Sequence, residues 1–243
     1  MTGTHMIVLP GGGYAEHASH EAEPVVEWLG DIGVRASVFR YPLRARHPEP
    51  LNALRAEIRR RRAAGAQRIG LIGFSAGGHL AGLAALAPGA PPDEAVDFAV
   101  LGYAITSMET ETYRPARVIL LGEDAGPELR RSTSLDSLVT PQSPPFFVWH
   151  TAEDPYVPAE HTYRLAAALA AGQVPTPCTC SPTARTASAS PGTPARPRYG
   201  PRWRKPGSTN RRDRRLHHWS PAIACSSAIC LRAAATSSSL VFA

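Results

Sequence analysis

Long apolar runs and a leader pattern are absent from this sequence. No stretch of about 18 apolar residues, the length that spans a bilayer, occurs in the 243 residues. The opening residues, MTGTHMIVLPGGGY, lack the charged-then-apolar order of a secretory signal peptide. We therefore expect a cytoplasmic protein with no membrane partner.

Lysine and cysteine are absent from residues 1–174. This part holds 15 arginines and 19 acidic residues, a net charge of −4, whereas residues 175–243 hold 11 basic residues and one acidic residue, a net charge of +10. The net charge of +6 for the whole chain therefore belongs to its last part. The four cysteines have neither zinc-ligand spacing nor the pattern of a secreted disulfide framework: Cys178, Cys180, Cys225 and Cys230. We expect no metal and no other cofactor.

Short apolar runs alternate with amphipathic stretches along residues 1–174, as in βαβ units around a mostly parallel sheet. The expected strands are residues 6–10, 36–41, 69–74, 98–104 and 146–151. The expected helices are residues 21–31, 51–64, 76–86 and 159–171. We predict one α/β domain over residues 1–174, with helices on both faces of the sheet.

The alternation stops after Gly172. Residues 175–243 are rich in Pro, Ser, Ala, Thr and Arg, and they hold few large apolar side chains that could form a core. We expect this segment to be a basic, disordered tail.

A serine lies between glycines in the stretch GFSAG, Gly73–Gly77, after an expected strand and before an expected helix. Glycines permit a turn so tight that the hydroxyl of Ser75 is lifted above the end of the strand. The N–H of Ala76, at the start of the helix, would then face the oxyanion formed when Ser75 attacks a carbonyl. A structural serine in a glycine-lined turn is the alternative, and the flanking strand and helix favour catalysis.

A glycine loop, LPGGGY, follows the first expected strand. Consecutive glycines let backbone N–H groups approach a substrate, and α/β-hydrolases place further oxyanion donors at this position. Gly12 and Gly13 are the expected donors. A phosphate-binding loop is the alternative, but neither the P-loop spacing with its lysine nor a Gly-x-Gly-x-x-Gly pattern is present.

An acidic residue follows the last expected strand in the stretch FFVWHTAEDPYVP. In this fold the catalytic acid comes after the serine and before the histidine. Asp154 is the expected acid, because Pro155 helps to fix a turn there, and Glu153 is the alternative.

Together, LPGGGY, RIGLIGFSAGGHLA, PPFFVWHTAEDPYVP and YRLAAALAAG resemble the α/β-hydrolase family of small bacterial esterases, related to acetyl esterases, acetyl xylan esterases and feruloyl-esterase-like proteins. The resemblance covers roughly residues 5–174. It implies a serine carboxylic-ester hydrolase of small acyl esters, with Ser75 and Asp154 as two members of a triad. It also implies strands before the glycine loop, so the domain is expected to be incomplete at its start.

The resemblance implies a histidine on a loop after Asp154, in a phrase similar to His-Gly-x-His-Gly-x-Gly, but the corresponding stretch, SPTARTASASPG, has none. We expect the other histidines before the tail to be packing or surface residues: His17, His20, His79, His150 and His161. His217 and His218 follow in the right order but much later in the chain. The base is therefore missing, and activity is expected to be impaired.

A change of reading frame near Pro175 is our hypothesis for this loss. Shifted codons permit His-Gly-x-His-Gly-Leu-Gly-Leu across residues 183–190, with the catalytic histidine opposite Thr186, and Leu-His-Val-Phe, typical of a buried strand, across residues 178–181. The last strand and helix of the fold are then expected to be missing.

Three other functions stay open. A peptidase of the prolyl-oligopeptidase type shares the serine turn but also carries a propeller or lid domain, for which these residues hold no pattern. A non-catalytic, hydrolase-like binding protein would fit the missing histidine. Arg196–Arg215 mixes basic and aromatic residues as nucleic-acid-binding arms do, although a shifted reading of GC-rich DNA yields the same composition, so no nucleic-acid partner is expected.

Overall fold

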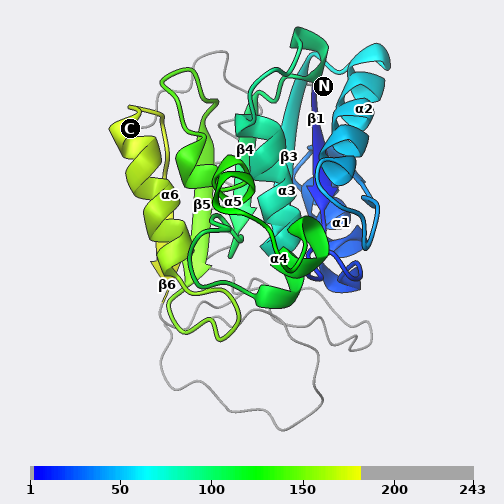
Figure 1. The fold of residues 1–243 in the computed structure, drawn as a ribbon. Coiled ribbons are helices and arrows are strands. Elements are labelled where there is room, and N and C mark those ends of the chain that lie inside the picture. The colour runs from blue at the N-terminus through cyan, green and yellow to red at the C-terminus, as the bar shows by residue number, and fades with distance from the viewer. Residues whose placement is uncertain (1–2, 182–243) are drawn as a thin grey trace, which may run out of the picture.

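Short apolar runs form the strands of one parallel sheet in the computed structural model, which describes residues 3–181 (Figure 1). The strand order is β2-β1-β3-β4-β5-β6, and every neighbouring pair is parallel. The strands are β1 (Thr4–Leu9), β2 (Arg35–Val38), β3 (Arg68–Phe74), β4 (Phe98–Gly102), β5 (Phe146–Thr151) and β6 (Cys178–Ser181). The five expected strands are confirmed, with bounds shifted by a few residues.

Helices cover both faces of the sheet. The four expected helices are α1 (Glu23–Asp31), α2 (Glu49–Ala63), α3 (Ser75–Leu86) and α6 (Glu160–Ala171). On one face, α2, α3 and α6 pack in a large apolar core with alternate strand residues such as Ile7 and Leu71. On the other face, Val25 and Leu29 of α1 pack with Met6, Val8 and Phe74. The predicted α/β architecture is therefore confirmed.

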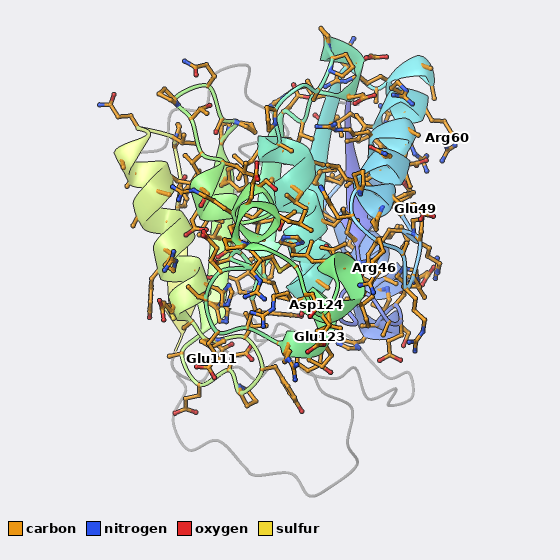
Figure 2. All side chains as sticks on the ribbon, viewed as in Figure 1. Arg46, Glu49, Arg60, Glu111, Glu123 and Asp124 are labelled. Carbon is orange, nitrogen blue, oxygen red and sulfur yellow. The ribbon has the colours of Figure 1, made fainter. Side chains whose placement is uncertain are left out.

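The carboxyl ends of the parallel strands share one edge of the sheet, at the lower side of Figure 1. Two short helices without a counterpart in the sequence analysis, α4 (Arg114–Leu121) and α5 (Pro127–Ser132), belong to the long connection between β4 and β5. Figure 2 shows the labelled Glu111, Glu123 and Asp124 of this connection near the same edge. No helix within residues 3–181 is long and apolar enough to cross a membrane.

A sixth strand corrects one expectation. The last strand of the fold was expected to be missing, yet β6 pairs with β5, with Cys178 opposite Val148 and Ser181 opposite Thr151. Without β6, the backbone N–H and C=O groups along one edge of β5 would have no partners. A short extended segment of almost any sequence can pair with them, because the ladder uses only backbone groups. Residues 182–243, which include the rest of the expected tail, Thr186, His217 and the basic stretch, lie outside the described part of the chain.

Candidate active site

Ser75 occupies a strained turn between β3 and α3. It is the first residue of α3, its φ is +49°, and its side chain is half-buried. A positive φ at a residue other than glycine is uncommon, and such strain gathers at functional sites. The sharp turn from strand to helix lifts the side chain at the carboxyl edge of the sheet, as in the nucleophile turn of α/β-hydrolases.

The glycines around Ser75 are required for space. A methyl group on Gly73 would lie 2.4 Å from the carbonyl oxygen of Gly77. One on Gly77 would lie 2.2 Å from the carbonyl oxygen of Leu9, at the end of β1. The turn therefore packs directly on the start of the glycine loop, which brings two motifs far apart in the sequence into contact.

The glycine loop presents backbone N–H groups beside this turn. Gly12 and Gly13 have φ values of +118° and +63°, and the carbonyl of Gly12 accepts hydrogen bonds from the N–H groups of Ala15 and Glu16 at 3.0 and 3.2 Å. Within residues 3–181, the N–H groups of Gly12 and Gly13 donate no hydrogen bond. Ala76 lies in the first turn of α3, where N–H groups have no partner in the helix. All three expected oxyanion donors thus belong to segments that meet at Ser75.

Asp154 follows β5 in a tight turn and is buried, whereas the alternative acid, Glu153, is exposed. Its Oδ1 accepts hydrogen bonds from the N–H groups of Tyr156 and Val157 at 2.9 and 3.0 Å. Its Oδ2 lies 3.7 Å from Nε2 of His150. A carboxylate fixed by its own turn suits an orienting role, and burial distinguishes it from Glu153.

The buried histidines have structural partners. His150 Nε2 donates to the carbonyl of Val157 at 2.9 Å, and His161 Nε2 donates to that of Glu111 at 2.9 Å. Burial lowers the pKa of both rings, so both are neutral at pH 7. No histidine in the described part of the chain is hydrogen-bonded to Ser75.

A second buried carboxylate near Ser75 escaped the sequence analysis. Glu21 accepts hydrogen bonds from the N–H of Gly11 and the hydroxyl of Tyr103, both at 2.6 Å. A lone glutamate beyond the loop carries no sequence signal, because one of its two partners, Tyr103, lies far along the chain. Two tyrosines near the glycine loop also differ in role: Tyr14 is fully buried in the core, and Tyr103 binds Glu21.

The fold has counterparts among known proteins. The crystal structure of an acetyl ester-xyloside bifunctional hydrolase from Caldicellulosiruptor lactoaceticus superposes with a TM-score of 0.70, is 36% identical, and the match covers 75% of this chain and 73% of the other. The family model BD-FAE matches residues 60–169. The chain belongs to the BD-FAE family of α/β-hydrolase esterases.

Two further proteins are similar to this chain. A carboxylesterase from Lactobacillus plantarum is 28% identical with a TM-score of 0.63, and the match covers 75% of this chain and 72% of that one. Endo-1,4-beta-xylanase B of Butyrivibrio fibrisolvens is 30% identical over 193 residues. That match covers 70% of this chain but 30% of the xylanase, so the chain spans less than a third of that protein's length.

Proposed function

We propose that this BD-FAE family chain is a serine ester hydrolase that forms an acyl-enzyme on Ser75. The observation that carries the proposal is the positive φ of Ser75 at the first residue of α3, which raises its hydroxyl beside the glycine loop. Ser75 Oγ attacks the ester carbonyl, and the alcohol leaves. The N–H groups of Gly12, Gly13 and Ala76 stabilise the oxyanion, and water then releases the acid.

The proposal includes slow turnover by the chain as written. Asp154 is assigned to orient a histidine that takes the proton of Ser75, but no described histidine binds Ser75. β6 ends at Ser181, on the sheet edge that also holds Ser75 and Asp154. In the frame that the hypothesis restores from about Pro175 onward, a histidine stands opposite Thr186, which follows the last residue of β6 closely in the sequence. This supports the frame-change hypothesis as the explanation for the missing base.

The substrate class is proposed to be small esters of the acetyl type, with acetylated sugars as one candidate. The support comes from the similar Caldicellulosiruptor lactoaceticus protein, which is described as an acetyl ester-xyloside bifunctional hydrolase. A cytoplasmic location is also part of the proposal.

The test is covalent labelling of Ser75. The purified chain is treated with a fluorophosphonate, and hydrolysis of 4-nitrophenyl acetate is followed in parallel. We expect Ser75→Ala to abolish both reactions, whereas Ser132→Ala, a change at an exposed serine, leaves both unchanged. Turnover should be about 10³-fold or more below that of an intact esterase.

Two other outcomes would redirect the proposal. A wild-type chain that is not labelled would favour the non-catalytic binding protein, which the absence of a base in residues 3–181 also fits. Turnover equal to an intact esterase and dependent on Ser75 would contradict the missing base. Accurate resequencing of the codons for residues 172–208 then decides whether the frame is shifted.

A further inference from the structure

Glu21 is a buried carboxylate that the proposed mechanism does not use. It is 4% exposed and ends a short 3-10 turn, η1 (Ser19–Glu21), beyond the glycine loop. Its Oε2 accepts the N–H of Gly11, and its Oε1 accepts the hydroxyl of Tyr103, each at 2.6 Å. Burying a carboxylate is costly unless its oxygens are hydrogen-bonded. These two bonds therefore fix Glu21 to two segments at once.

Gly11 lies between Glu21 and Ser75 and leaves no room for a side chain there. A methyl group on Gly11 would lie 2.8 Å from Glu21 Oε2 and 3.1 Å from Cβ of Ser75. Glu21 thus holds the glycine loop where the loop passes the proposed nucleophile. Because Glu21 uses the N–H of Gly11, the groups left in the loop to face an oxyanion are those of Gly12 and Gly13.

Tyr103 connects this carboxylate to the acid side of the site. It follows β4, its φ is +36°, and its N–H donates to the carbonyl of Trp149 in β5 at 2.8 Å. Burial, followed by the negative charges of Glu21 and Asp154, raises the pKa of Tyr103, so the hydroxyl stays protonated and donates to Glu21. A chain of contacts therefore runs from the glycine loop through Glu21 to the end of the strand that precedes Asp154.

We propose that Glu21 is a positioning residue of the oxyanion hole. By binding Gly11 and Tyr103, it fixes the glycine loop against the ends of β4 and β5, so that Gly12 and Gly13 face Ser75 before a substrate arrives. The role is geometric: it requires hydrogen-bonding atoms at these two places and no negative charge. The inference rests on the proposed function, because it assigns Glu21 to a reaction at Ser75.

Two variants of Glu21 separate geometry from charge. Glu21→Ala removes both hydrogen bonds. Glu21→Gln keeps them, because the amide oxygen accepts the N–H of Gly11 and the amide N–H donates to the hydroxyl of Tyr103. Glu23→Ala is the matched control: Glu23 follows in the same segment, but its side chain is 57% exposed and binds the exposed Arg40.

The readouts are the rate of fluorophosphonate labelling of Ser75 and the hydrogen exchange of a peptide that covers residues 9–15. We expect Glu21→Ala to slow labelling about 10- to 100-fold, less than the roughly 10²- to 10³-fold cost of losing an oxyanion donor, because the donors are displaced and not removed. Exchange in this peptide should become faster. Glu21→Gln should label within about threefold of the wild-type rate, and Glu23→Ala should match the wild type in both readouts.

Each contrary result has a definite meaning. If Glu21→Ala folds and is labelled at the wild-type rate, the inference is overturned. It is also overturned if Glu21→Gln slows labelling as much as Glu21→Ala does. If Glu21→Ala does not fold, Tyr103→Phe replaces it: faster exchange in residues 9–15 supports the inference, and unchanged exchange overturns it. If the wild-type chain is not labelled, the proposed function fails, and the exchange data alone decide whether Glu21 positions the loop.

Discussion

The hydroxyl of Tyr14 donates a hydrogen bond of 2.7 Å to Nδ1 of His79 in the core behind the glycine loop. Nε2 of the same ring donates to the carbonyl of Thr133 at 2.8 Å, so the ring is neutral and carries its proton on Nε2. Both side chains are fully buried. His79 therefore ties the last residue of the LPGGGY stretch to α3 and to the chain after α5.

Burial of His79 should make the protein acid-sensitive. Burial lowers the pKa of His79 from 6.5 to about 4, so its stabilising contribution is present above pH 6.5 and is lost as the pH falls toward 4. The loss amounts to about 3 kcal/mol of unfolding free energy. The measurement is urea unfolding of wild type and His79→Gln at several pH values. The stability difference between the two proteins should shrink with acid.

The other histidines do not affect this difference in stability, because both proteins contain them. His5 has a pKa lowered by burial to about 4, and it contributes equally to both curves. A difference that stays constant from pH 7 to pH 4 would refute the prediction.

The pH dependence of labelling should reveal the missing base. No histidine within residues 3–181 is bonded to Ser75. If attack therefore requires the serine alkoxide, the labelling rate should rise about tenfold for each pH unit from 6 to 9. An active-site histidine would instead give a plateau above about pH 7. A plateau in the wild-type chain would show that a base is present.

The turn at Ser75 should not tolerate a methyl group at Gly77. Gly77→Ala would bring Cβ to 2.2 Å from the carbonyl oxygen of Leu9, and we expect a loss of about 3 kcal/mol or more, with loss of labelling. Gly30→Ala is the control, because Gly30 lies in α1 with nothing within 4 Å of the added Cβ. It should stabilise the protein by up to about 1 kcal/mol. Urea unfolding compares the two, and equal effects would contradict the packing argument.

Two exposed tyrosines flank the site. A methyl group on Gly13 would lie 3.0 Å from Cε1 of Tyr113, and the ring centroid of Tyr113 lies 6.1 Å from that of Tyr156, edge to face. Tyr156 in turn donates its N–H to Asp154. The pair therefore extends from the glycine loop to the loop of the proposed acid.

Truncation of this pair should alter substrate preference. We expect Tyr113→Ala and Tyr156→Ala to raise the KM for an ester with a bulky ring about threefold to tenfold, with little change for ethyl acetate. Tyr163→Ala is the control, because Tyr163 is also exposed but lies on α6 against Cys180. The check is steady-state hydrolysis of both esters. Equal effects on the two substrates would show that the pair does not contact the ring.

The spacing of apolar residues predicted the main strands and helices of the sheet. Successive residues of β1, such as Ile7 and Val8, enter the two separate cores in turn, and the glycines around Ser75 are needed there for steric reasons. The short helix α4 and the strand β6 were not predicted. A strand such as β6 is stabilised by the backbone of its neighbour, and its own residues, CTCS, give no apolar pattern.

The sequence by itself determined the parallel α/β fold, the turn at Ser75 and the glycine loop, because each follows from residue periodicity or from the steric needs of adjacent residues. The tertiary structure decided the rest. It distinguished Asp154 from Glu153 by burial, assigned His79 and His161 to structural bonds, and brought Glu21 between Gly11 and Tyr103. These relationships depend on distances between segments far apart in the chain, which only the packing of the sheet and its helices sets.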